Sequence, residues 1–199
     1  MNSRMKALRA IAIPLAALFA SIPALAAGSE TWTVDPVHST AQFTARHFGI
    51  VPVIGTIPIV RASVELNPGS QIPVSVTAEL DASKIDTHND HRDSDLRSAH
   101  YFNVTETPTI KFVSTKITGT DPSHFTIAGD FTMHGQTHSI TLSAQVVAAG
   151  KTPHGRSIIA YAATATIDRT QWGMTYGPLI VGNNVDLSIN AEADAPEGT

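Results

Sequence analysis

The stretch FTIAGDFTMHGQTHSITLSAQV, residues 125–146, carries two runs of alternating apolar and polar residues on either side of His134-Gly135. Apolar or small side chains occupy every second position from Phe125 to Met133, and again from Ile140 to Val146. Because neighbouring side chains of a strand point to opposite faces, a period of two predicts strands that bury one face. With a glycine turn between them, the two runs predict an antiparallel hairpin.

The same alternation recurs along most of the chain. It predicts further strands over residues 41–48, 53–66, 74–81, 109–117, 159–167 and 185–192. The one helical candidate covers residues 89–99, with Asp90 and Asp93 near its start and Arg97 near its end, as the helix dipole favours. About eight antiparallel strands with one apolar face each must bury those faces in a sandwich or a closed barrel. We therefore expect an all-β protein with one short helix.

Residues 1–26 have the pattern of a cleavable signal peptide. Basic residues open the segment, an apolar run follows over residues 11–22, and Ala24-Leu25-Ala26 supplies the small residues of a cleavage site. The apolar run is shorter than the roughly 20 residues of a membrane-spanning helix. We therefore expect a periplasmic protein with one mature domain over residues 27–199.

Composition excludes several classes of function. The chain has 199 residues and no cysteine, so a thiolate nucleophile and a cysteine metal site are both excluded. Three of its 13 basic residues lie in the leader, which leaves 10 against 17 Asp and Glu in the mature domain, a net charge of −7. An acidic domain without a basic patch is not expected to bind nucleic acid.

Several motifs occur in order along the mature chain: Trp32-Thr-Val34-Asp35-Pro-Val-His38-Ser39, Phe43-Thr-Ala-Arg-His47, Ile85 to Ser98, Phe131-Thr-Met-His134-Gly135-Gln-Thr137 and Ile167 to Gly173. Together they resemble the YceI-like family of periplasmic polyisoprenoid-binding proteins. The resemblance implies an antiparallel, eight-stranded lipocalin-like barrel, with an apolar channel that holds a polyprenyl or quinone-type chain. It implies no catalytic activity. Ile57 and Thr107 stand where aromatic residues are commoner in the family, which bears on the ligand rather than on the fold.

Candidate channel residues are of two kinds. Small residues on the inward rows are expected to leave room for a ligand: Ala41, Ala45, Gly129, Ala144, Ala163 and Ala165. Aromatic residues are expected to form the channel wall, although alternation alone is equally consistent with an ordinary core: Phe43, Phe48, Phe102, Phe112, Phe131 and Trp172. An apolar wall would solvate a hydrocarbon tail, since each buried CH₂ group contributes about 0.8 kcal/mol.

Polar candidates for the ligand head group are His47, Arg92, Arg97 and Arg169. His47 falls on the same strand face as Phe43 and is expected to point inward. Guanidinium groups suit phosphate or quinone oxygens. The alternative for the arginines is a structural ion pair, with Asp90, Asp93 or Asp95 for the first two and Asp168 for Arg169, and we favour it for Arg92 and Arg97.

These observations predict a carrier that sequesters a long isoprenoid-type lipid, without a catalytic residue, a resident cofactor or a metal ion. A homodimer and transient contact with a membrane or membrane protein fit the same hypothesis. One alternative is a metal-dependent periplasmic stress enzyme using His88, His91 and Asp93. Another is a module with a solidly filled barrel that docks a membrane partner through its rim.

Overall fold

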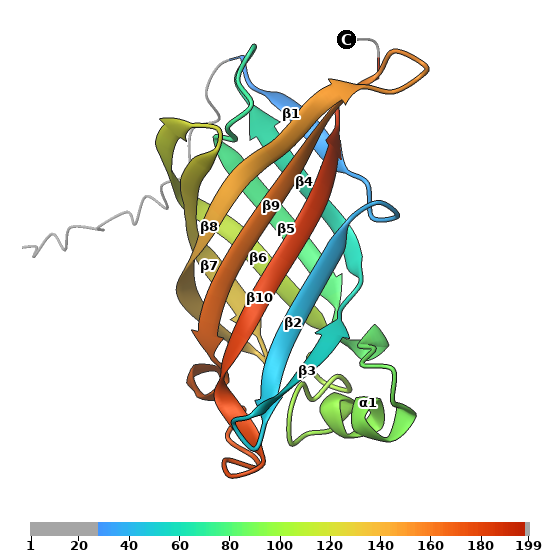
Figure 1. The fold of residues 1–199 in the computed structure, drawn as a ribbon, viewed down its shortest axis with the longest axis vertical. Coiled ribbons are helices and arrows are strands. Elements are labelled where there is room, and N and C mark those ends of the chain that lie inside the picture. Colours follow the sequence, from blue (N-terminus) through green and yellow to red (C-terminus); the bar gives the residue numbers. More distant parts are fainter. Residues whose placement is uncertain (1–27, 198–199) are drawn as a thin grey trace, which may run out of the picture.

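The chain forms a closed antiparallel barrel in the computed structural model, which describes residues 28–197 (Figure 1). Its strands are β1 (Glu30–Val34), β2 (Thr40–His47), β3 (Val51–Thr56), β4 (Ile59–Leu66), β5 (Ser75–Asp81), β6 (Thr109–Asp121), β7 (His124–Met133), β8 (Gln136–Lys151), β9 (Ser157–Asp168) and β10 (Val181–Asp194). The helices are the short 3₁₀ turns η1 (Ala82–Lys84) and η2 (Arg169–Trp172) and the α-helix α1 (Asp90–Arg97). The expected signal peptide over residues 1–26 lies outside the described residues.

The strands occupy eight positions around the barrel. β1 and β2 follow one another along one position and β3 and β4 along the next, because β1 pairs with β4 while β2 pairs with β3. The ring closes where β10 pairs with both β2 and β1, through Leu187 opposite Phe43 and Asp194 opposite Thr33. Closure pairs the edges of most strands and so reduces the sites of edge-to-edge association; among the described strands, β3 pairs with β2 on one side and has the bridge Thr56–Asp86 on the other.

The predicted strand over residues 53–66 is divided in the structure, because Pro58 has no amide hydrogen to donate to a ladder. The segment after β5 fills the gap: the Asp81 amide donates to the Pro58 carbonyl over 3.0 Å, and Thr56 and Asp86 exchange backbone hydrogen bonds of 2.8 and 3.0 Å. Alternation does not predict β1, which the structure adds to the barrel. The others are confirmed with shifted ends.

Alternation predicts the two faces of the sheet correctly. On β7, Phe125, Ile127, Phe131 and Met133 are buried, while the side chains between them are more exposed. The hairpin of β7 and β8 has Phe125 opposite Ala144 and Met133 opposite Gln136, as the quoted stretch predicts. The buried rows of all strands meet in one apolar core.

The helix and its neighbours cover one end of the barrel, drawn at the bottom of Figure 1 and called here the α1 end. Helix α1 begins after Asn89, whose side chain accepts from the Arg92 amide over 3.0 Å, a normal N-cap. It is shorter than the predicted 89–99 because Ser98 adopts an extended conformation. None of the helices within residues 28–197 is long and apolar enough to cross a bilayer.

Candidate functional site

An apolar cavity of about 220 Å³ lies inside the barrel. Every strand except β3 contributes side chains to its wall, and the segments that cover the α1 end contribute the rest. Tyrosines apart, Gln42 and Arg169 are the polar residues of that wall. The interior is therefore hollow and hydrocarbon-like, and the alternative of a solidly filled barrel is wrong.

The cavity is long relative to its volume. Tyr161 near the start of β9 and Arg169 just beyond its end both border it, a separation of roughly 25 Å along an extended strand. Pockets for compact, drug-sized ligands have roughly 300–1,000 Å³. A volume of about 220 Å³ distributed along this length suits a slender chain better than a bulky ring system.

Four of the six predicted aromatic residues border the cavity: Phe43, Phe102, Phe112 and Phe131. Two of these rings occupy the space beside glycines of the neighbouring strand. A Cβ on Gly55 would lie 2.4 Å from Cζ of Phe43, and one on Gly129 would lie 2.5 Å from Cζ of Phe112. The expectation that Gly129 leaves room for a ligand is therefore wrong, because the ring of Phe112 occupies that space.

The other small inward residues behave largely as expected. Ala41, Ala45, Ala144 and Ala163 border the cavity, whereas Ala165 packs against the core without reaching it. Their short side chains leave the central space of the barrel open. Small inward side chains, including the paired Ala144 and Ala163, thus contribute to keeping this interior from being filled.

The remaining aromatic candidates do not border the cavity, so the expectation that they line the channel is wrong. Phe48 lies in the turn between β2 and β3 with a φ of 51° and an exposed fraction of 61%. His47 is also exposed, and its ring centroid lies 4.1 Å from that of Phe48. His47 is four residues after Phe43 and therefore has the same side-chain direction along the strand. It is exposed because β2 ends at His47, at the end of the barrel.

Trp172 is buried, at 1% exposure, yet it supports the wall from behind. Its indole Nε1 donates to the Phe131 carbonyl over 3.0 Å, and its ring packs edge-on against Phe131. His134 Nδ1 lies 2.8 Å from the Trp172 carbonyl. The His134-Gly135 turn and the Arg169–Trp172 turn are therefore joined, and Trp172 positions a lining ring without touching the cavity.

Arg169 lies at the α1 end of the cavity and is 3% exposed. Its guanidinium donates to three backbone carbonyls: Val181 over 2.9 Å, Gly182 over 3.1 Å and Met174. Asp168 instead caps η2 by accepting from Thr170, and no ion pair to Arg169 is found within residues 28–197. Burial lowers the pKa of Arg169, but an arginine remains protonated at neutral pH.

The ring of Tyr101 lies beside the Arg169 guanidinium. The guanidinium carbon of Arg169 lies 6.0 Å from the ring centroid, and Tyr101 also borders the cavity. Desolvation raises the pKa of the Tyr101 hydroxyl, so it stays neutral and can act as a donor. The wall therefore combines a hydrocarbon surface with one cationic, hydrogen-bonding end.

Arg92 and Arg97 lie on α1 outside the cavity wall. Arg92 donates from Nε to the Thr87 hydroxyl and from Nη2 to the Thr87 carbonyl, each over 2.7 Å. Arg97 donates to the Ile85 carbonyl over 3.4 Å. The ion pairs found within residues 28–197 do not include either arginine, so the favoured pairing with Asp90, Asp93 or Asp95 is wrong.

The alternative metal set does not converge. Asp93 is buried and accepts from the backbone amide and hydroxyl of Thr87. His88 is exposed, with Nδ1 3.3 Å from Asp86, and His91 is exposed as well. Asp93 thus holds the loop that precedes α1. The structure gives no support to a metal enzyme built on His88, His91 and Asp93.

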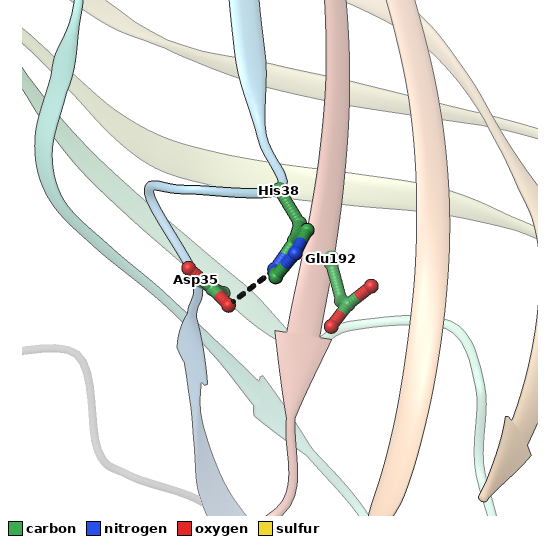
Figure 2. A group of neighbouring side chains, drawn as sticks. All are labelled: Asp35, His38 and Glu192. Carbon is green, nitrogen blue, oxygen red and sulfur yellow. Dashed lines mark hydrogen bonds and ion pairs between the residues drawn. The ribbon is translucent and has the colours of Figure 1, made fainter. Parts of the chain in front are cut away.

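Among the described residues, one group of three potential metal ligands does come together: Asp35, His38 and Glu192 (Figure 2). It lies at the corner between β1 and β2, beside β10. Asp35 already accepts from the Val37 amide at Oδ1 and lies 2.7 Å from His38 Nδ1 at Oδ2. The Asp35 amide donates to the Glu192 carbonyl, and the Glu192 amide donates to Ser39 Oγ. These bonds join the corner between β1 and β2 to β10, where the barrel closes, and this structural role explains the arrangement.

Sequence reasoning missed some wall residues. Leu96 lies on α1, and Tyr101 and Met174 lie in connecting segments, so no strand alternation shows which of these side chains faces inward. The sequence signal that could have identified Tyr101 is its position directly before Phe102, a predicted wall residue. Aliphatic wall residues such as Leu187 and Ile189 follow from the strand pattern already identified.

Solved structures with this fold are similar over most of the chain. The crystal structure of BcnA from Burkholderia cenocepacia has a TM-score of 0.71 at 18% identity, covering 80% of this chain and 98% of that one. A YceI protein from Campylobacter jejuni has 0.68 at 21%, covering 76% and 90%. A polyisoprenoid-binding domain from Saccharophagus degradans has 0.59 at 12%, covering 83% and 98%.

Sequence relatives extend over similar lengths. A UPF0312 protein from Vibrio cholerae is 26% identical over 184 residues, covering 92% of this chain and 95% of the relative. One from Staphylococcus epidermidis is 28% identical over 165 residues, covering 79% and 94%. The family model for the YceI-like domain matches residues 32–193. The cavity, the barrel and these matches agree, and the chain belongs to the YceI-like domain family.

Proposed function

We propose that this protein is a periplasmic carrier that encloses a long isoprenoid-type lipid, such as a quinone or a polyprenyl phosphate, and has no catalytic role. The observation that carries the proposal is the apolar cavity that extends along the barrel to Arg169. The polyisoprenoid-binding domain from Saccharophagus degradans, which has the same fold, supports this class of ligand. The signal-peptide pattern of residues 1–26 supports the compartment.

The mechanism is solvation of the tail by the barrel. A hydrocarbon gains about 0.8 kcal/mol for each CH₂ group removed from water. A segment of about ten carbons would gain on the order of 8 kcal/mol before the cost of immobilisation is subtracted. Since the wall presents almost no polar atoms, it selects for a slender apolar chain and against polar molecules.

Arg169 and Tyr101 would receive the polar end of the ligand. Guanidinium has five N–H donors, and the three carbonyls of Met174, Val181 and Gly182 do not use all of them. An oxygen of a quinone or phosphate placed at the α1 end would accept from the remaining donors. Arg169→Met would remove this interaction, while the strand side chains that enclose the tail along the barrel would remain in place.

The test is extraction of the purified protein with organic solvent, followed by mass spectrometry. We expect a stoichiometric isoprenoid-type compound. Ala163→Leu would fill the cavity and lower the amount recovered at least severalfold, without unfolding the barrel, because the added carbons occupy empty space. Thr164→Leu is the matched control, since Thr164 is the next residue of β9 and is exposed.

Recovery of no hydrophobic compound, together with no binding of added polyprenols or quinones, would contradict the proposal. Equal recovery from Ala163→Leu and Thr164→Leu would place the ligand outside the cavity and contradict it as well. A carrier of this kind must exchange its cargo with a membrane or a membrane protein, and it can act as a monomer or a homodimer.

A further inference from the structure

Two neighbouring loops at the α1 end expose large apolar side chains. One is the turn between β2 and β3, and the other precedes β10. We name the set the apolar tip: Phe48, Ile50, Val51, Tyr176, Leu179 and Ile180. Leu179 is 87% exposed, Ile50 76% and Phe48 61%.

The two loops are held together by the backbone. The Phe48 amide donates to the Ile180 carbonyl over 2.8 Å, and His47 pairs with Val181. Figure 1 shows both loops projecting beyond the strands at the bottom of the barrel, with α1 to one side. The exposed side chains therefore belong to one fixed protrusion, not to separate residues scattered over the surface.

The charge pattern of the tip differs from that of the whole domain. The mature domain is acidic, yet residues 36–64 and 169–185, which include both loops, contain no Asp or Glu. The first of these segments instead contains Arg46, His47 and Arg61. The apolar tip itself contains no carboxylate that would repel anionic lipid head groups, and the exposed Arg46 beside it, whose Nη2 lies 4.0 Å from Asp186 Oδ2, would be attracted to them.

The tip adjoins the wall of the cavity. Val181 follows Ile180 directly and borders the cavity. Tyr176 packs edge-on against Tyr101, a wall residue, with ring centroids 5.7 Å apart, and stacks on His100 at 4.1 Å. A lipid leaving a bilayer under the tip would meet the cationic end of the apolar channel within one or two side chains.

We propose that the apolar tip inserts into the surface of a phospholipid bilayer and holds the α1 end of the barrel against it. Aliphatic side chains at the end of the loops enter the acyl boundary, and the Tyr176 ring lies at the head-group level, as aromatic residues do at membrane interfaces. The inference deepens the proposed carrier function and rests on it.

The test is co-sedimentation of the purified protein with vesicles of mixed phosphatidylethanolamine and phosphatidylglycerol. We expect the protein to sediment with the vesicles. The double variant Ile50→Asp with Leu179→Asp should lose about tenfold or more in partitioning, since two apolar anchors become charged. Both positions are exposed, so the fold should be retained.

Val147→Asp is the matched control. Val147 is an exposed apolar residue, at 58%, in the part of β8 farthest from the tip, and its substitution should leave sedimentation unchanged. The lipid extracted from each variant is measured in parallel. Loss of vesicle binding with retained lipid would support the tip and the carrier function separately.

Three outcomes would overturn the docking proposal. One is a wild-type protein that stays in the supernatant, and another is equal sedimentation of the double variant. The third is a wild-type dimer in solution that the double variant dissociates without any vesicle binding, which would assign the tip to a second copy of the chain. In each case, recovery of lipid from the purified protein would still support the carrier function.

Discussion

Nδ1 of His38 lies 2.7 Å from Oδ2 of Asp35, across the corner at which the first strand position of the barrel changes from β1 to β2 (Figure 2). The pairing raises the pKa of His38 through its hydrogen bond to Asp35 and lowers the pKa of Asp35 through the same bond. The two shifts agree in direction. The protonated imidazole and the ionised carboxylate therefore stabilise each other in the folded protein.

This pair predicts a pH-dependent stability. Because the pKa of His38 is raised on folding, its contribution is complete below the ordinary histidine pKa near 6.5 and is lost as pH rises through the higher folded value. Because the pKa of Asp35 is lowered, its contribution is lost only as pH falls below the ordinary aspartate range. His38→Gln should thus lower the melting temperature more at pH 5.5 than at pH 8.5. An equal loss at both values would contradict this assignment.

Gly129→Ala should destabilise the barrel by about 1–3 kcal/mol, as overpacking does in a close-packed core. A Cβ there would lie 2.5 Å from the Phe112 ring and 2.6 Å from the Val113 carbonyl, and a backbone oxygen cannot move aside cheaply. Gly150→Ala on β8 is the control, because its Cβ would meet nothing within 4 Å. Urea denaturation followed by circular dichroism measures both, and similar midpoints would contradict the expectation.

Trp172→Phe should cost about 1–3 kcal/mol, because it leaves the buried Phe131 carbonyl without its indole donor. Trp172→Ala should cost about 3–5 kcal/mol, as removal of a buried aromatic ring does. Guanidinium denaturation followed by circular dichroism gives both values. The bound lipid should fall with Trp172→Ala only, since the phenyl ring still supports Phe131. Equal lipid loss in both variants would mean that Trp172 touches the ligand.

Arg169→Met should loosen the segment between η2 and β10. The guanidinium bridges the carbonyls of Met174, Val181 and Gly182, and a hydrogen bond from a charged donor contributes about 1.5–3 kcal/mol. Hydrogen exchange should accelerate over residues 174–182 while β7 and β8 stay protected. Arg92→Met, which alters the Thr87 contacts of α1, should leave that segment unchanged. Uniform acceleration across the barrel would show that Arg169 stabilises the whole fold.

Much of the architecture can be read from alternation. The rows that contain Phe125, Ile140 and Leu187 face inward as the period of two requires, because a strand has no other way to segregate its side chains. The helix follows from Asn89 and the charges after it. β1 is too short to show a clear period, and its role in closing the barrel depends on pairing with β10, a contact between distant parts of the chain.

The sequence by itself determined which side chains turn inward along most of each strand, how many strand positions the barrel has, and that its inward face is hydrocarbon. His47, which has the inward parity but is exposed at the barrel end, is an exception. Only the tertiary structure decided which inward residues border open space. Phe112 fills the gap that Gly129 leaves, Trp172 stands behind the wall, and Arg169 reaches the cavity end. The physical reason is that the direction in which a side chain points is a local property of an extended backbone. The position of a void depends instead on the volumes of side chains that come together across the barrel from strands far apart in the chain.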